Sequence, residues 1–307
     1  KEEDGIVWHS FSLLPWGPFS YLQHVKKLAR TINAEWIIGV SDLWYGIMAE
    51  TVAGSTGARF LIDAYDNYES YIPWLTPVHR IWRRSLTHAD AVTAAGQPLA
   101  EFMQKTSGRP KVDVVPMAAD PIFGPADQYF CRKKIDLPTD AILIGYTGAL
   151  HPNRGIELIF QIHQRLRKHN PKITLVLSGR LDRRIRLPPG IIWLGYRPAE
   201  QVPLVINSLD LLMALNKPGS FGDHSYPAKL YEAIACDIPV IATDVPGTRW
   251  ILQDSPEVLA QAGNVDDFCE KALAVLNGKV SIRAKPSTWE NSANILEKIL
   301  FLSCRKS

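Results

Sequence analysis

The sequence predicts an α/β protein of two domains, each a parallel sheet doubly wound by helices. Three observations lead to this prediction. Short β-rich runs alternate with amphipathic stretches along the chain, which is typical of βαβ units. The 307 residues suit two domains of about 150 residues each. The alternation breaks between residues 116 and 141, where prolines cluster and a domain boundary is expected.

The first domain is expected over residues 1–125. Its helices are predicted from apolar residues that share one face, and its strands from short buried-type runs between turn residues. Leu13–Phe19 is predicted to be a loop because of its prolines and glycine. The predicted strands are Gly5–Phe11, Trp36–Val40, Arg59–Ala64, Ala89–Ala94 and Val112–Val115, and the helices are Tyr21–Ile32, Leu43–Ala53, Pro77–Thr87 and Pro98–Lys105.

The second domain is expected over residues 126–286, with a closing helix in residues 287–307. The alternation restarts there after the proline-rich break, and several strands end in glycine or a polar residue. The predicted strands are Ala141–Tyr146, Ile173–Leu177, Ile191–Leu194, Leu209–Leu215 and Pro239–Thr243, and the helices are Ile156–His169, Gln201–Ser208, Pro227–Cys236, Val265–Asn277 and Thr288–Leu302.

Composition excludes several other classes of protein. The chain is 46% apolar and 21% charged, which does not fit disorder, collagen-like repeats or a coiled coil. Its net charge of +3 is too small to indicate nucleic-acid binding. No apolar run reaches the ~18–20 residues that span a bilayer. The cysteines are expected to be reduced, in a cytoplasmic protein without a cysteine metal site, because none of the four forms a CxxC pair: Cys131, Cys236, Cys269 and Cys304.

The most informative stretch is Ser225–Gly247, which reads SYPAKLYEAIACDIPVIATDVPG. A proline opens its predicted helix, where the missing N–H costs nothing. The N-terminus of such a helix suits a diphosphate, because its N–H groups are free and the dipole is positive there. Glu232, one to two turns further, could bind a pair of hydroxyls such as those of a ribose. The alternative is a surface helix with a solvated Lys229 and Glu232.

Two further motifs follow predicted strands. Gly148–Gly155 reads GALHPNRG, and Arg154 stands where a guanidinium can pair with phosphate oxygens. This segment is neither a GxGxxG nor a Walker A loop. The second motif is Gly195-Tyr196-Arg197. Because ligands of doubly wound sheets lie at the carboxyl ends of strands, both motifs are expected at one cleft, although either could be an ordinary turn.

Together these segments resemble the retaining glycosyltransferases of the group 1, or family 4, type, which have the GT-B fold. The resemblance covers most of the chain in a fixed order of blocks. The N-terminal blocks are THADAVTAAGQPLAEFM and VDVVPMAADPIF. The C-terminal blocks are YTGALHPNRGIELI, LVLSGR, IIWLGYRPAEQVP, LDLLMALNK, SYPAKLYEAIACDIPVIATDVPG and STWENSANIL.

The resemblance implies two Rossmann-like domains that face a cleft, with a nucleotide-diphosphate sugar on the second, an acceptor on the first, and no cofactor or metal. Transfer would retain the anomeric configuration, by front-face attack. Arg154 and Lys229 are the implied catalytic cations, and Glu232 the ribose ligand. Backbone near Tyr196 and Arg197 would hold the base. The remaining residues expected in the donor site are Gly148, Asp223, His224, Ser225 and Tyr226.

The chain departs from the family pattern at several positions. Ala149 stands where the family has a diphosphate-binding arginine, so Lys229 or Arg180 is expected to supply that cation. His224, with Asp223 beside it, stands in place of the first glutamate of the family's E-x7-E pair, which leaves the sugar open. Asp237 replaces a helix-ending glycine and is expected to adopt the left-handed conformation.

Asp66 is the implied catalytic carboxylate of the first domain. It occupies the aspartate place of a His-Asp pair that the family often has, and Tyr65 occupies the histidine place. Asp66 would orient or deprotonate an acceptor hydroxyl. The alternative is an Asx turn at the end of a strand. Ser41 and Asp42, at the end of the preceding strand, are candidates for the same cleft.

The expected partners are a nucleotide-sugar donor and a glycan or lipid-linked acceptor, with no nucleic acid. A peripheral contact with the inner membrane face is an open alternative to solvated helix faces and core tryptophans. The residues concerned are Lys26, Lys27, Arg30, Arg80, Arg83, Arg84, Trp16, Trp74 and Trp82.

Two rival functions stay open: a nucleotide-sugar 2-epimerase of the same fold, and a non-catalytic scaffold. The first domain lacks the family's opening strand, glycine loop and first helix. We therefore expect it to be truncated by about 50 residues, given the ~30-residue size of a βαβ unit. Its sheet should then have a missing or exposed strand.

Overall fold

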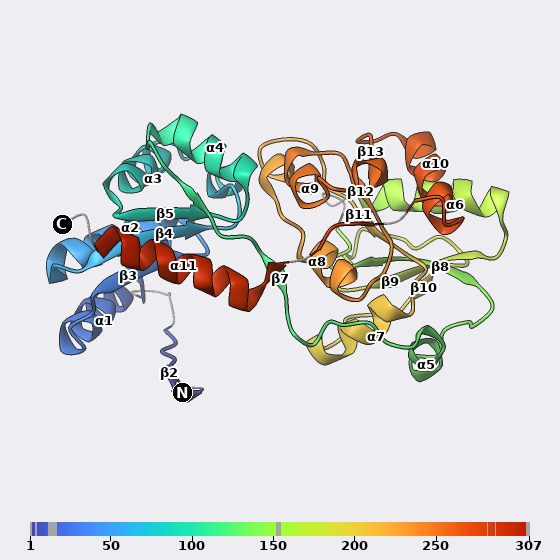
Figure 1. The fold of residues 1–307 in the computed structure, drawn as a ribbon, viewed down its shortest axis with the longest axis horizontal. Coiled ribbons are helices and arrows are strands. Elements are labelled where there is room, and N and C mark those ends of the chain that lie inside the picture. The colour runs from blue at the N-terminus through green and yellow to red at the C-terminus, as the bar shows by residue number, and fades with distance from the viewer. Residues whose placement is uncertain are drawn as a thin grey trace.

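The computed structural model describes residues 2–3, 5–11, 17–151, 155–280, 282–285 and 287–304. Two parallel sheets lie side by side, each with its own helices, and the chain passes between them twice (Figure 1). This is an α/β fold of two Rossmann-like domains.

The first sheet has four parallel strands in chain order, β3-β4-β5-β6. One face is covered by α2, α3 and α4, and the other by α11, whose Ile299 packs on Leu61 and Ala91. Helix α11 is the last element of the chain, so the chain crosses back from the second domain to end on the first (Figure 1). The elements are β3 Trp36–Val40, β4 Arg59–Ala64, β5 Ala91–Ala94, β6 Asp113–Val114, α1 Gly17–Thr31, α2 Leu43–Thr56, α3 Thr76–His88, α4 Gln97–Ser107 and α11 Trp289–Cys304.

The second sheet has six parallel strands in the order β10-β9-β8-β11-β12-β13. The order reverses at β8, as in a doubly wound dinucleotide-binding fold. Its elements are β8 Ile142–Thr147, β9 Ile173–Ser178, β10 Ile192–Trp193, β11 Leu211–Ala214, β12 Val240–Thr243, β13 Leu259–Ala260, α5 Gln128–Lys134, α6 Ile156–His169, α7 Val202–Asn207, α8 Ala228–Ala235, α9 Pro246–Ile251 and α10 Val265–Leu276.

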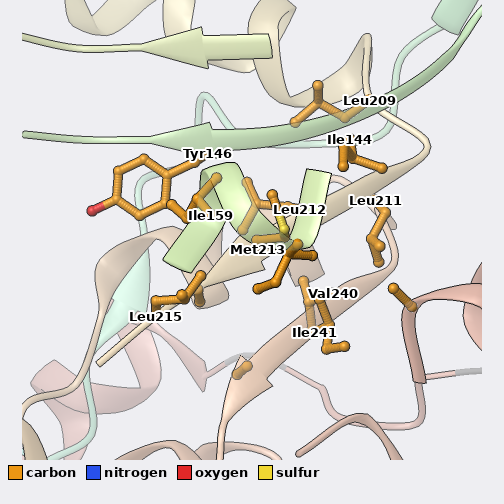
Figure 2. Close-up of a cluster of buried hydrophobic side chains, with 14 of the residues drawn as sticks. Ile144, Tyr146, Ile159, Leu209, Leu211, Leu212, Met213, Leu215, Val240 and Ile241 are labelled. Atoms are coloured by element: carbon orange, nitrogen blue, oxygen red, sulfur yellow. The ribbon is translucent and has the colours of Figure 1, made fainter. Parts of the chain in front are cut away.

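The core of the second domain is built from the central strands. Ile144, Leu212 and Val240 are fully buried and come from three neighbouring strands, which explains why these strands read as continuous apolar runs (Figure 2). Tyr146 lies at the margin of this cluster with its hydroxyl pointing away (Figure 2). An ion pair between the buried Arg132 and the half-buried Asp210, 2.7 Å apart, ties α5 to the sheet of this domain.

A short parallel pairing connects the two domains. β14 (Ser287–Thr288) pairs with β7 (Ala118–Ala119), so both passages of the chain run together. The Ser292 hydroxyl at the start of α11 donates to the Pro116 carbonyl over 2.8 Å. The two passages therefore brace each other between the sheets.

Several sequence-based predictions of elements were wrong. Gly5–Phe11 is not one strand: β1 (Glu2–Glu3) and β2 (Ile6–Val7) form an exposed antiparallel pair that turns at Gly5. Helix α1 begins at Gly17, inside the predicted Leu13–Phe19 loop, of which residues 13–16 lie outside the described residues. Helix α5 was not predicted, although Asp127 caps it by accepting from the Phe130 N–H over 2.6 Å.

The first sheet ends in an exposed strand, β3, among the described residues. Ile38 and Val40 on β3 are 41% and 39% exposed, although parallel strands are usually covered. The truncation of the first domain itself stays a prediction.

Candidate active site

A cavity of about 570 Å³ lies where the order of the second sheet reverses. β8 ends at Thr147 and β11 at Ala214, and the loops after them form its floor. A crevice at this point is the usual ligand site of a doubly wound sheet. The first domain closes the cavity from the opposite side, so both domains line it. The lining residues include Tyr65, Asp66, Met117, Tyr146, Thr147, Gly148, Ala149, Ser178, Gly179, Arg180, Tyr196, Arg197, Asn216, Phe221, Ser225, Tyr226, Pro227, Lys229 and Glu232.

Three glycines bring the strand ends together. The Gly148 N–H donates to the Ser178 carbonyl over 2.9 Å, and the Gly179 N–H donates to the Gly195 carbonyl over 2.8 Å. Gly179 has φ +141°, and a Cβ there would overlap the Gly148 carbonyl. These contacts explain why the loops after β8, β9 and β10 can pack so closely.

Lys229 lies at the base of the cavity, in the first turn of α8. Its ammonium nitrogen is 3.6 Å from the centre of the Tyr146 ring, a cation–π contact. A Cβ added to Gly148 would come within 3.2 Å of the same nitrogen. No described side chain caps the N-terminus of α8. A fixed cation and free backbone N–H groups therefore face the cavity together, as an anion site requires.

Glu232 lies one turn beyond Lys229 on the same face of α8 and lines the cavity. Burial raises the pKa of the Glu232 carboxyl, and the nearby Lys229 ammonium partly offsets this effect. A half-buried carboxylate with acceptor oxygens suits a pair of hydroxyls.

Tyr196 and Arg197 form the wall near β10. The Tyr196 ring is 64% exposed, and the Arg180 guanidinium lies 5.0 Å from its centre. Arg197 donates to the Gln201 side chain over 3.3 Å, while its buried Nε has no partner among the described residues. Buried donors are normally paired, so this wall has an unused donor beside the cavity.

The loop between β11 and α8 brings in Ser225 and Tyr226. Tyr226 is buried against the first domain: its hydroxyl accepts from the Leu99 N–H over 3.0 Å, and its ring fills the space over Gly96. Burial raises the Tyr226 pKa, so its hydroxyl stays protonated. Tyr226 is thus both a lining residue and a contact between the domains.

Asp223 and His224 do not line the cavity. Asp223 accepts from the Gly219 N–H over 3.1 Å, which closes the loop on itself. The His224 ring packs on Phe102 of the first domain, with centres 4.6 Å apart. The short helical turn Gly222–His224 directs both side chains away from the cavity lining.

Asp66 enters the cavity from the first domain, just after β4. The Tyr71 hydroxyl donates to its Oδ2 over 2.7 Å. Burial and the adjacent Asp66 raise the Tyr71 pKa, so Tyr71 remains the donor. Of the neighbouring candidates, Ser41 bonds to the Tyr65 hydroxyl over 3.1 Å, and neither Ser41 nor Asp42 lines the cavity.

Comparison with known proteins identifies the second domain. Residues 141–278 match the model of the family described as "Glycosyl transferases group 1". The second domain is a group 1 glycosyltransferase domain. The fold of the chain is that of GT-B proteins: sucrose-phosphate synthase from Thermosynechococcus elongatus superimposes with a TM-score of 0.78 at 14% identity, over 98% of this chain and 86% of that one. Anabaena HepE, solved with UDP-glucose, gives 0.68 at 14% identity, over 93% and 77%.

Curated relatives share the same region at low identity. A protein of Bacillus subtilis named as a teichuronic acid biosynthesis glycosyltransferase is 24% identical over 203 residues, 62% of this chain and 50% of the relative. The D-inositol 3-phosphate glycosyltransferase of Stackebrandtia nassauensis is 25% identical over 215 residues, 61% of this chain and 47% of the relative. The chain spans about half the length of these relatives.

The glycosyltransferase domain also contributes residues that the sequence did not single out. Tyr146 and Phe221 line the cavity, and Arg180, named only as a substitute cation, lines it too. A tyrosine at the end of an otherwise aliphatic strand was the available sign for Tyr146. Arg154 lies outside the described residues.

Within the described ranges, no group of three or more His, Cys, Asp or Glu side chains is arranged to hold a metal ion. No helix among the described residues is long and apolar enough to cross a membrane.

Proposed function

We propose that this protein is a glycosyltransferase that moves a sugar from a nucleotide-diphosphate sugar to an acceptor hydroxyl. Transfer retains the anomeric configuration and needs no metal ion. The observation that carries the proposal is one cavity lined by Lys229 and the start of α8 on one side and by Asp66 on the other. It joins an anion site to a carboxylate that can hold a hydroxyl, the two elements that sugar transfer uses.

The anion site stabilises the leaving group. As the bond between the sugar carbon and the diphosphate oxygen breaks, negative charge grows on the phosphate. Lys229, the N–H groups of α8 and the guanidinium of Arg180 supply positive charge at that place without a metal. Arg154 is the further cation that we expect there.

The acceptor side uses Asp66. Its carboxylate orients the acceptor hydroxyl toward the anomeric carbon, on the face that the diphosphate leaves. The acceptor oxygen forms the new bond from that face, which retains the configuration, and its proton passes to the departing phosphate. The cavity-lining carboxylate of the second domain, Glu232, is assigned instead to the ribose hydroxyls.

The nucleoside part of the donor lies against Tyr196 and Arg197. The complex of Anabaena HepE with UDP-glucose supports a nucleotide-sugar donor for this fold. The match of the second domain to the group 1 family favours transfer over 2-epimerisation. Lys229 and Glu232 in one cavity favour an enzyme over a scaffold.

The acceptor is a glycan or a lipid-linked precursor, and the protein works in the cytoplasm, at the inner membrane face. Trp74 is 75% exposed just before α3, whose outer side carries Arg80 and Arg84, and this combination suits a lipid headgroup surface. Trp82 makes no contribution, because it is 3% exposed and packs in the core. Arg83 pairs with Glu69 over 2.5 Å.

A donor screen tests the proposal. UDP- and GDP-sugars are incubated with a panel of glycan and lipid-linked acceptors in EDTA, and products are detected by mass spectrometry. We expect one sugar to be added to an acceptor, with the anomeric configuration of the donor by NMR. Epimerised sugar without acceptor would favour the 2-epimerase, and no calorimetric binding of UDP or GDP would favour the scaffold.

A further inference from the structure

Tyr71 is the residue that holds Asp66. It is the last residue of the short 3-10 helix Tyr68–Tyr71, which follows Asp66 and Asn67. This turn brings the Tyr71 hydroxyl back to the carboxylate. The bond to Oδ2 is 2.7 Å long, in the range of charge-assisted hydrogen bonds. Such a bond restricts rotation of the carboxylate about its last side-chain torsion.

The Tyr71 ring is itself held from the other domain. Its centre is 5.9 Å from that of Phe221, which lines the donor side of the cavity, and 5.9 Å from that of Tyr68 beneath it. Next to this contact, the Asn67 side chain donates to the Ser220 carbonyl over 2.9 Å. The segment that carries Asp66 is therefore seated on the loop that carries the donor-side residue Phe221.

We propose that Tyr71 is a positioning residue, which fixes the Asp66 carboxylate for the acceptor hydroxyl when Phe221 of the second domain packs against it. This inference rests on the proposed function. It makes the acceptor side depend on the seating of the donor loop, since separation of the domains removes Phe221 from the Tyr71 ring. The position of Asp66 is then coupled to the seating of the donor-side loop that carries Phe221.

Asp66 shares its cavity with the charged side chains of Lys229, Arg180, Arg197 and Glu232 from the second domain. From its own segment Tyr68 and Tyr71 interact with it, and from the second domain Tyr226 does. Asp42, at the start of α2, acts on Tyr71. The pKa values of Tyr68, Tyr71 and Tyr226 are raised, so their hydroxyls stay protonated, and loss of the Tyr71 donor leaves the carboxylate less stabilised.

The test uses the donor and acceptor that the screen identifies, with UDP and GDP as binding probes. Tyr71→Phe keeps the ring and removes the hydroxyl. We expect about a tenfold loss of kcat/KM for the acceptor, with unchanged affinity for the nucleotide. The acidic limb of the pH profile should move to higher pH. Tyr129→Phe, on the exposed surface of α5, is the matched control and should change none of these values.

A double-mutant cycle separates positioning from a general structural role. In the Asp66→Asn background, Tyr71→Phe should cost little more, because the carboxylate it positions is absent. Phe221→Leu, a second variant, should lower the same acceptor parameter and should not add fully to Tyr71→Phe. Equal losses in both backgrounds, or an unchanged acceptor kcat/KM in Tyr71→Phe, would overturn the inference and leave the transferase intact. If neither UDP nor GDP binds, the proposed function fails, and the inference fails with it.

Discussion

The two domains contain the same kind of parallel sheet but differ in how much of the site each one determines locally. In the second domain the strand order reverses, and the reversal creates a crevice whose floor is made by consecutive loops. In the first domain the described strands follow one another in chain order, so their order has no reversal at which such a crevice would form. Its carboxylate, Asp66, is held by Tyr71 of its own domain, and the segment that carries both residues contacts the other domain through Asn67 and Tyr71. The donor side is thus set by local structure, and the acceptor side by assembly.

The largest effect expected on the donor side is that of Lys229→Ala. The variant removes the cation beside the start of α8, and kcat should fall by about 10²–10³-fold, as when an oxyanion donor is lost. Steady-state kinetics on the identified donor measure this, with circular dichroism as the check on folding. Lys133→Ala is a matched control: Lys133 lies 5.6 Å from the Tyr129 ring, in a cation–π pair outside the cavity. Equal turnover in both variants would remove Lys229 from the mechanism.

This distinction also explains what the sequence could predict. Pro227, Lys229 and Glu232 lie within six positions on one helix, so a local motif was enough to place them in one site. The left-handed conformation expected of Asp237 is confirmed, at φ +57°, because a helix end is also local. Tyr226 and Leu99 are 127 positions apart, and no local pattern shows that one caps the other's N–H. The same holds for Phe221 and Tyr71.

The outcome for Asp223 and His224 has the same physical origin. Their positions in the motif predicted donor contacts, but the turn that precedes α8 gives their side chains partners within the loop and on Phe102. The prediction for Trp82 failed for the same reason. Its nearness in sequence to arginines suggested a membrane surface, but its ring fills the core under α2. The direction of a side chain in a loop depends on its neighbours in space, and a local sequence motif does not identify them.

Glu232→Gln should have an intermediate effect on activity. It should lower nucleotide affinity but raise the stability of the fold. Burial raises the Glu232 pKa above its unfolded value, so the folded state holds its proton more tightly. Stability is then lost as pH rises between the two pKa values, and the glutamine variant should have a higher Tm at neutral pH. Nucleotide affinity should fall about tenfold, because a charged acceptor for the ribose is gone.

Two measurements check this prediction: calorimetric titration with UDP and GDP, and thermal unfolding from pH 4 to 8. Wild-type nucleotide affinity should also weaken toward low pH, as Glu232 becomes protonated. Unchanged affinity in the variant would show that Glu232 does not bind the nucleotide. A lower Tm at neutral pH would show that its carboxylate is stabilised in the fold by contacts other than those seen.

The smallest effects test whether the two domains unfold as one unit. Gly54→Ala, at an exposed position in α2 with open space around it, should stabilise the first domain by about 0.5–1 kcal/mol. Asp237→Gly should stabilise the second by up to about 1 kcal/mol. Asp237 lies at φ +57° in a Schellman-type end of α8, in which the Ile238 N–H donates to the Ala233 carbonyl over 2.9 Å.

Tyr226 and Tyr231 of the second domain pack within the core of the first, so we expect one cooperative transition. Each variant should then raise the same Tm, by roughly 2–4 °C per kcal/mol, and the double variant should show the sum because the positions are on separate elements. Differential scanning calorimetry measures this directly. Two resolved transitions, each moved by only one of the variants, would mean that the interface does not couple the folds. The acceptor side would then lose the support that this structure gives it, because Asp66 would sit in a domain that can unfold while the donor site stays intact.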